Sequence, residues 1–462
     1  MNARIPAAAT PPAKSLPIGL PVAVLLGLLL PGTSARAQVP SPSPAEPGER
    51  IALVGGTIYP MTGPPIRNGK ILFRDGIIEA VGDAIVLPAD TRAIDMTGMS
   101  IYPGFISTNT ALGLTEIGSV RQTVDYQEVG AINPNARVEV ALNPESELLP
   151  VARANGITTA LVVPRGGLLS GTSALIHPDG WTWEQMVVKA PVALHLSWPS
   201  LSLNRQPEAK PIDEQIAGQE RSLRRIRRTF ADARAYALAR AASPRPGAPR
   251  PEGDVRWEAM LPVFDRRLPV IVQADDARQI RMALDWAEEE GIRLILSGGR
   301  DAPLAAERLR ERGVPVILGS TLRLPDRDYE PYDEAYTVAA RLYQEGVSFC
   351  ISTGGDAANE RNLPYHAAMA WAYGLPHDEA LRAITLYPAR ILQVDDRLGS
   401  LEAGKEATLI VTDGDPLEIR SHVVREYIAG RLVDLANKHT RLYEKYRLRP
   451  QGAPGGSGRP SR

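Results

Sequence analysis

The chain has 462 residues, of which 44% are apolar and 23% are charged, and its formal net charge is −1. These values are typical of a globular protein, and the length allows one large domain with a small one, or two to three modest domains. Residues 1–37 contain three basic residues and no acidic one, so the rest of the chain carries a net charge of −4. A mildly acidic chain lacks the basic surface that general nucleic-acid binding requires, so we expect no nucleic-acid partner.

Residues 1–37 have the features of a secretory signal. Arg4 and Lys14 accompany an apolar run from Leu16 to Leu30, and Ala35-Arg36-Ala37 has the small-x-small pattern of a cleavage site. The run is roughly 15 residues long and contains prolines, whereas a membrane-spanning helix needs about 20 apolar residues. The pattern predicts a secreted or periplasmic protein with no membrane anchor after cleavage. Residues 38–50 follow as a proline-rich linker.

Residues 51–100 are predicted to form the first part of a small β domain. Short apolar runs alternate with turn residues, and Asp75-Gly76 between two such runs is a strong hairpin signal. Strand-like runs return near the C-terminus, at Leu409–Thr412 and Glu426–Ile428. We therefore expect residues 51–100 and 396–435 to form one β-sandwich from both ends of the chain, followed by a tail over residues 436–462.

Between these parts, residues 101–395 alternate buried-strand patterns with helical patterns. Such units predict a parallel sheet covered by helices, and their number over this length favours a TIM-like (β/α)8 barrel. Gly166–Ser173 is interpreted as a tight turn at the barrel rim, in preference to an anion-binding loop. Seven strands can be assigned, at Ile101–Ile106, Ile157–Val163, Val192–Trp198, Pro269–Ala274, Arg293–Ser297, Val314–Leu318 and Ser348–Ser352. The predicted helices include Asp213–Ala242, Ala277–Glu290, Pro303–Arg312 and Pro331–Gln344.

Three stretches together resemble the amidohydrolase superfamily, in particular its imidazolonepropionase-like branch. The first runs from Gly55 to Gly82, and the second is Tyr102-Pro103-Gly104-Phe105-Ile106. The third, from Ala380 to Ala407, is the most specific, because it places a helix, a Gly-Ser turn and a Gly-Lys turn in the family's order. The resemblance implies a TIM-like barrel with a β-sandwich. It also implies a hydrolase of non-peptide carbon–nitrogen bonds, in which one or two divalent metals activate water.

The positions of the family's metal ligands are degraded in this chain. Asn109 and Ala111 stand where the family carries a His-x-His pair, and Gln273 and Ser297 stand at two later histidine positions. Gly354 occupies the aspartate position after the last strand. Asn, Gln and Ser are poor zinc ligands, and Ala and Gly offer no side-chain ligand at all. The resemblance thus implies that these five positions line the pocket and bind no metal.

Four residues remain as weak catalytic candidates. His195 lies in an apolar run, where it is interpreted first as a hydrogen-bonded core or pocket residue, and Asp275 follows the strand that contains Gln273. Asp356 lies two residues beyond Gly354, and His366 begins a helix near the last strand. An acid/base enzyme that reuses Asp275, His195 or Asp356 is one alternative.

Three charged residues, Arg165, Arg300 and Asp301, also lie just beyond predicted strand ends, where barrel active sites are built.

Two hypotheses follow for function. The first is a hydrolase of carbon–nitrogen bonds with an unusual or metal-free site, for which the resemblance implies a small amide or cyclic amide as substrate. The second is a catalytically inactive barrel in the periplasm that binds a ligand or a protein partner. We expect no cofactor, and zinc or another divalent metal only if a non-standard site has been rebuilt. The sequence leaves the oligomeric state open, a homo-oligomer included.

Overall fold

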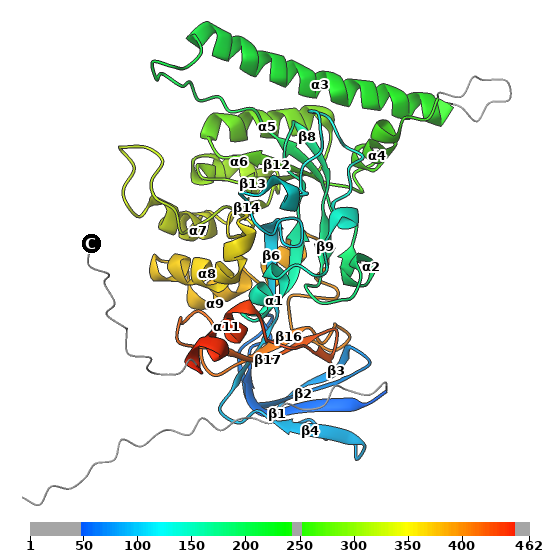
Figure 1. Cartoon of the computed structure of the whole chain (residues 1–462), viewed down its shortest axis with the longest axis vertical. Coiled ribbons are helices and arrows are strands. Elements are labelled where there is room, and N and C mark those ends of the chain that lie inside the picture. Colours follow the sequence, from blue (N-terminus) through cyan, green and yellow to red (C-terminus); the bar gives the residue numbers. More distant parts are fainter. Residues whose placement is uncertain (1–47, 243–251, 449–462) are drawn as a thin grey trace, which may run out of the picture. The chain divides into compact units, whose positions relative to one another are not determined.

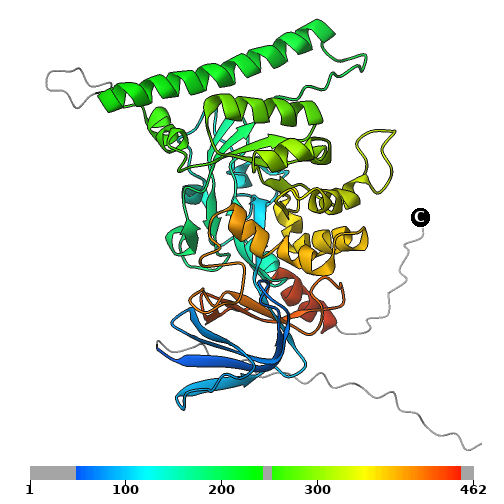
Figure 2. The same ribbon diagram turned by 180° about the vertical axis from the view of Figure 1, so that it is seen from behind.

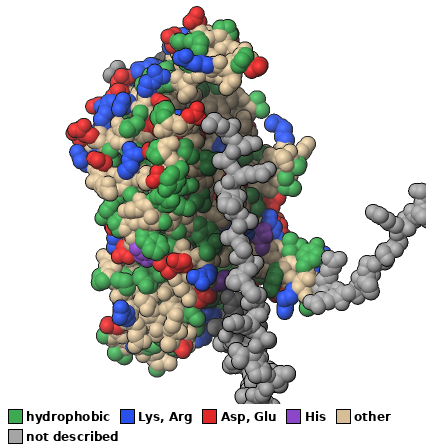
Figure 3. Space-filling model, turned by 90° about the vertical axis from the view of Figure 1, so that its left-hand side faces the viewer, with side chains coloured by type: hydrophobic (Ala, Val, Ile, Leu, Met, Phe, Trp, Pro, Cys, Tyr) green, Lys and Arg blue, Asp and Glu red, His purple; other side chains and the backbone are tan. Residues whose placement is uncertain are grey.

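The computed structural model describes residues 48–242 and 252–448, so the predicted signal segment and most of the linker lie outside the described residues. Helices and strands are mixed along the chain, which confirms the predicted α/β class (Figure 1). Within these ranges, no helix is both long enough and apolar enough to cross a membrane. On the face in Figure 3, the described basic and acidic side chains are interspersed, with apolar side chains between them.

Both ends of the chain contribute strands to one eight-stranded sheet, which Figures 1 and 2 show in blue and in orange to red. Its order is β18-β17-β16-β5-β1-β2-β3, and β4 pairs with β1. The predicted hairpin at Asp75-Gly76 joins β2 to β3, and both residues have positive φ, as a tight turn of this kind requires. The second layer of the predicted β-sandwich stays a prediction. The strands are β1 (Arg50–Ile58), β2 (Ile66–Arg74), β3 (Ile77–Gly82), β4 (Thr91–Asp95), β5 (Ser100–Pro103), β16 (Leu409–Thr412), β17 (Val423–Ile428) and β18 (Arg431–Leu432).

Two further sheets have the orders β10-β9-β7-β6 and β15-β14-β13-β12-β11-β8. Their strands include all seven that the sequence predicts, although the predicted strand Ile101–Ile106 is divided at Gly104 between β5 and β6. A Cβ atom at Gly104 would lie 2.0 Å from Thr158 Oγ1, so only glycine fits where the chain passes from one sheet to the other. The strands are β6 (Phe105–Thr110), β7 (Ile157–Val162), β8 (Leu169–Thr172), β9 (Ala174–Ile176), β10 (Val187–Lys189), β11 (Leu194–Ser197), β12 (Val270–Ala274), β13 (Leu294–Gly298), β14 (Val316–Leu318) and β15 (Phe349–Ile351).

Parallel pairing dominates these two sheets, but one segment runs against it. Strands β11 to β15 pair in parallel, as do β6 and β7. In contrast, β8 pairs antiparallel with β11, and β9 pairs antiparallel with β7. The prediction that Gly166–Ser173 is only a tight turn was therefore wrong, because half of this segment forms β8. A closed barrel of eight parallel strands stays a prediction.

Helices pack on these strands through apolar faces. Helix α5 has a capping box at Asp276 and ends at Gly291 in the left-handed conformation, which explains why its predicted bounds match the structure. Its Trp286 contacts Phe230 of α3 with ring centroids 4.8 Å apart, so the inner face of the long basic helix is buried. The helices are α1 (Leu148–Arg153), α2 (Trp183–Met186), α3 (Ile212–Ala242), α4 (Val255–Phe264), α5 (Ala277–Glu290), α6 (Ala306–Glu311), α7 (Glu334–Gln344), α8 (Leu363–Ala372), α9 (His377–Arg382), α10 (Leu386–Ile391) and α11 (Lys438–Arg447), with short 3₁₀ turns η1 (Arg121–Thr123), η2 (Val138–Ala141), η3 (Ala302–Ala305) and η4 (Ala357–Asn362).

Candidate functional site

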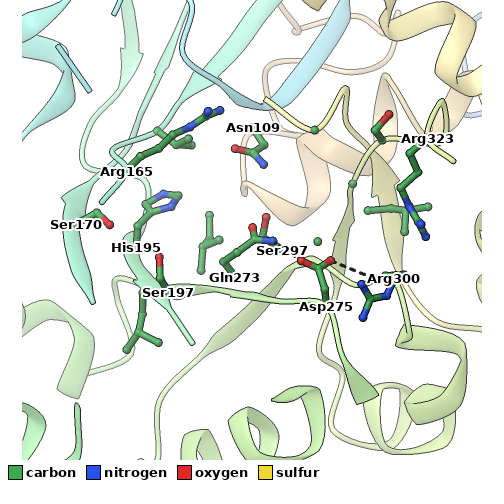
Figure 4. Close-up of a pocket in the computed structure, with 18 of the residues that line it drawn as sticks. Asn109, Arg165, Ser170, His195, Ser197, Gln273, Asp275, Ser297, Arg300 and Arg323 are labelled. Atoms are coloured by element: carbon green, nitrogen blue, oxygen red, sulfur yellow. Dashed lines mark hydrogen bonds between the residues drawn. The ribbon is translucent and has the colours of Figure 1, made fainter. Parts of the chain in front are cut away.

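A pocket of about 530 Å³ lies at the carboxyl ends of the parallel strands (Figure 4). The strand register places three of its lining residues side by side, because Ser197 of β11 pairs with Gln273 of β12, and Gln273 pairs with Ser297 of β13. Asn109 of β6 and Gly354, just after β15, complete this ring of positions. A volume of this size suits a small molecule.

A glycine makes room for two of the pocket side chains. Gly298 ends β13 with a φ of +92°, and a Cβ atom there would lie 2.4 Å from Gln273 Nε2 and 2.5 Å from Asp275 Oδ1. No side chain could occupy that space without displacing both groups. The glycine at this left-handed position therefore leaves free the space that the amide and the carboxylate occupy.

Arg165 and His195 form one side of the pocket (Figure 4). The Arg165 guanidinium lies over the Tyr126 ring, 5.4 Å from its centroid, and donates from Nη2 to the Gly355 carbonyl oxygen at 2.5 Å. Burial lowers the pKa of Arg165. Burial and the neighbouring Arg165 charge lower the pKa of His195 to about 3, so its imidazole is neutral at physiological pH.

Asp275 stands on the opposite side, beside Arg300 (Figure 4). Its carboxylate accepts a hydrogen bond from Gln273 Nε2 at 3.0 Å and one from the Arg300 backbone N–H at 3.4 Å. The Arg300 side chain pairs instead with Asp326, at 2.8 Å, and that carboxylate also lies 3.4 Å from Arg323. The pocket thus combines charged groups of both signs with neutral amides and hydroxyls.

A buried carboxyl group, that of Glu360 on η4, lies close to this pocket without lining it. Glu360 is fully buried and accepts hydrogen bonds from Ser107 Oγ at 2.5 Å and from Thr353 Oγ1 at 3.0 Å. Burial raises the pKa of Glu360 to about 7, although these hydroxyls and the Arg165 charge oppose the shift. The group therefore changes protonation near neutral pH.

Comparisons with known proteins agree with the fold and with the sequence motifs. Residues 276–439 match the model of the amidohydrolase family. The chain is 27% identical over 413 residues to an imidazolonepropionase of Syntrophobacter fumaroxidans, which covers 78% of this chain and 87% of that one. It is also 24% identical over 427 residues to amidohydrolase tasK of Hapsidospora irregularis, covering 84% of this chain but 42% of that protein. A solved amidohydrolase from Thermotoga maritima superposes with a TM-score of 0.74 at 26% identity, over 83% of this chain and 99% of that one.

Residues 276–439 are an amidohydrolase-family domain. The expected metal centre of an amidohydrolase needs imidazole or carboxylate ligands that converge on one point. Four of the corresponding positions line the pocket here, but they present the amides of Asn109 and Gln273, the hydroxyl of Ser297 and the bare backbone of Gly354. Across the described ranges, no group of three or more His, Cys, Asp or Glu side chains could hold a metal ion. These four positions therefore do not supply the imidazole or carboxylate side chains that such a metal centre uses.

Three of the predicted site residues lie outside the pocket lining. Ala111 was expected to line the pocket, but it follows the last residue of β6, is only 2% exposed and packs in the hydrophobic core. Asp356 caps η4, where it accepts from the Ala358 N–H at 3.1 Å. His366 is buried on α8, and its Nδ1 accepts from the Thr321 N–H at 3.3 Å. Of the four catalytic candidates, the structure brings only His195 and Asp275 together in the pocket.

Sequence reasoning found some of the pocket's charged residues and missed others. Arg165 and Arg300 were marked by their places beyond strand ends, and both line the pocket. Arg323 and Asp326 also line it, but they lie in the long segment between β14 and α7, where no motif marks them. Glu360 lies on a 3₁₀ turn without hydrophobic periodicity, so nothing in the sequence signalled that its carboxyl would be buried.

Proposed function

We propose that this amidohydrolase-family protein binds a small polar molecule in the pocket at its strand ends and does not carry out metal-dependent hydrolysis. The observation that carries this proposal is the chemistry of Asn109, Gln273, Ser297 and Gly354, none of which is a good metal ligand. The same positions remain suited to hydrogen bonding. We also infer that the two smaller sheets form one TIM-like barrel. The contacts of β6 with both β7 and β15 support that closure.

The pocket presents hydrogen-bonding side chains where a metal centre would need metal ligands. Gln273 is exposed at its strand end, and Ser197 and Asn109 are half-buried, so their polar groups reach the cavity. His195 Nε2 is buried and has no hydrogen-bond partner among the residues described. A buried polar atom without a partner is costly, and a bound polar ligand that donates to or accepts from this nitrogen would remove that cost.

The test is the metal content of the purified protein. The chain is dialysed against zinc, then against metal-free buffer, and the bound metal is measured by mass spectrometry. We expect far less than one zinc per chain in the natural protein. The matched control is N109H/Q273H/S297H, which places three imidazoles at lining positions and is expected to retain zinc. One tightly bound zinc per natural chain would overturn the proposal.

A second candidate function is hydrolysis of a carbon–nitrogen bond without a metal. Two observations favour it: Asp275 and His195 line the same pocket, and the relatives include an imidazolonepropionase and an amidohydrolase. In this scheme the Asp275 carboxylate, positioned by Gln273, would accept a proton from water that attacks the carbonyl carbon of a small amide or cyclic amide. Release of ammonia or ring-opened product by the natural protein, abolished in D275N and retained in the exposed control D232N, would support it. Equal rates in the natural protein and D275N would exclude it.

The predicted secretion is a further proposal. Its support is the signal pattern in residues 1–37, and its check is the N-terminal sequence of the protein recovered from a periplasmic extract. A mature chain that begins at Gln38 is the expected result.

A further inference from the structure

We propose that the ligand of this pocket is a zwitterion of the size of an amino acid or dipeptide, whose carboxylate pairs with Arg165 and whose cationic group pairs with Asp275. This inference rests on the proposed function, because it requires the pocket to be a binding site. It goes further by naming the charge pattern of the ligand. Four observations support it. Among the described residues, Arg165 has no ion-pair partner, Asp275 has none either, the other charged side chains of the pocket pair with each other, and polar groups line the space between Arg165 and Asp275.

The first observation is the unpaired Arg165. Its guanidinium is largely enclosed, yet it makes no ion pair with any residue in the described ranges, and its side-chain hydrogen bond goes to the Gly355 carbonyl oxygen. The Tyr126 ring covers one face of the group. The charges of Glu360 and Asp356 act on Arg165, but neither acid forms an ion pair with it. Glu360 accepts hydrogen bonds from Ser107 and Thr353, and Asp356 accepts them from the backbone of Ala358 and the side chain of Asn359. A buried cation is costly without an anionic partner, and a guanidinium fits a carboxylate well.

The second observation is the unpaired Asp275. Its carboxylate receives hydrogen bonds from an amide and from a backbone N–H, but no cationic side chain of the described chain pairs with it. The nearby Arg300 side chain is turned away toward Asp326 and Asp301, at 2.8 and 3.3 Å. Gly298 keeps the space beside the carboxylate clear of a side chain. Asp275 is therefore available to an ammonium group that enters the cavity.

The third observation is that the remaining charges of the pocket already have partners. Asp326 lies within ion-pair distance of both Arg300 and Arg323. This leaves Arg165 and Asp275 as the opposite charges open to a ligand, and Figure 4 shows them on opposite sides of the cavity. A ligand with one charge would neutralise one of them and leave the other enclosed without a partner. A zwitterion would neutralise both.

The fourth observation is the polar lining between the two charges. Asn109, Gln273 and Ser297 lie between Arg165 and Asp275 in Figure 4, and His195 stands beside Arg165. The unpartnered His195 Nε2 is one nitrogen that an amide group of the ligand could satisfy. Charges at both ends and amide-binding groups between them match a dipeptide or an amino-acid amide derivative.

The test uses four matched probes and titration calorimetry at low salt, where ion pairs are least screened. Glycyl-leucine carries both charges, acetyl-leucine lacks the ammonium group, glycine isopentylamide lacks the carboxylate, and N-isopentylacetamide lacks both. We expect glycyl-leucine to bind the natural protein at least ten-fold more tightly than either singly charged probe. R165M should remove the preference over glycine isopentylamide, and D275N should remove the preference over acetyl-leucine. R165K retains the charge, and it should keep most of the preference if R165M does not fold.

The controls are R228M and D232N, matched charge changes on exposed positions of α3, which should leave all four affinities unchanged. Equal affinities for the four probes would overturn the zwitterion inference. Failure of all four to bind at about 10 mM, a concentration at which even very weak binding is detected, would also overturn it. The metal measurement would be unaffected by that result, so failure of this inference and failure of the proposed function are distinguishable.

Discussion

Replacing the buried Glu360 by Gln should change how the protein's stability depends on pH. Burial raises the pKa of Glu360 from its ordinary value of 4.5 to about 7 in the folded state. Below pH 4.5 the group is protonated in both the folded and the unfolded state, so it has no effect on the pH dependence. Between pH 4.5 and 7 the unfolded chain releases the proton first, so the free energy of unfolding falls as the pH rises. Above pH 7 the loss is complete.

The magnitude follows from the size of the shift. At 1.36 kcal/mol for each pKa unit, the ionised carboxyl costs about 3 kcal/mol of folding stability above pH 7. E360Q cannot ionise, but its amide still meets Ser107 and Thr353, whose hydroxyls can reorient toward it. The variant should therefore lose less stability than the natural protein between pH 4.5 and 8, and the difference should be about 3 kcal/mol.

Urea unfolding of both proteins at pH 4.5 and pH 8, followed by circular dichroism, measures this difference. Any fixed cost of placing an amide in the buried site cancels, because it is the same at both pH values. E311Q, a substitution at an exposed position of α6, is the control, and its free energy of unfolding should change with pH as that of the natural protein does. If E360Q lost as much free energy of unfolding as the natural protein between pH 4.5 and pH 8, the assignment of a raised pKa to the buried Glu360 carboxyl would be refuted.

Three further predictions follow from the site. A111H should destabilise the protein by about 1–3 kcal/mol through overpacking of the core, whereas N109H at the pocket surface should not, as urea unfolding of the pair will show. G298A should cost about 1–3 kcal/mol, because it adds a Cβ atom at positive φ within 2.5 Å of two pocket side chains, whereas G118A, which meets open space, should be neutral in the same assay. His195, with its pKa lowered to about 3, should show no imidazolium signal at pH 5 in nitrogen-15 NMR, and a protonated ring at that pH would contradict its burial.

Local rules explain which parts of the fold could be predicted from the sequence. The Asp75-Gly76 turn and helix α5 were predicted because a hairpin signal and the spacing of apolar residues along one helix face are both local in the sequence. The division of Ile101–Ile106 at Gly104 was missed, because the conflict there is with Thr158, a residue distant in the sequence. Strand β8 was missed for a similar reason, since its partner β11 lies beyond the reach of local patterns.

Pocket residues were predicted correctly from the sequence only where they lie at the ends of barrel-type strands. Gln273 and Ser297 were expected in the pocket because the family resemblance puts them at ligand positions on two successive strands, and the strand register pairs these two residues directly. Ala111 was assigned to the pocket by the family's His-x-His pattern, but that pattern cannot show that the side chain at this position is buried in the core. Asp356 was considered for its distance from the strand, whereas its hydrogen bond to the Ala358 N–H commits it to capping η4.

The pairing of β5 with β16 imposes an order on the assembly of the protein. Ser100 lies opposite Thr412 in this ladder, so the innermost pair of the shared sheet joins segments from near the two ends of the chain. During synthesis, β5 emerges long before its partner and presents an open edge of backbone donors and acceptors, the kind of edge that promotes self-association. A chain released before β16 is complete would keep that edge open. Pairing of β16 with β5 covers that edge, whatever the pocket binds.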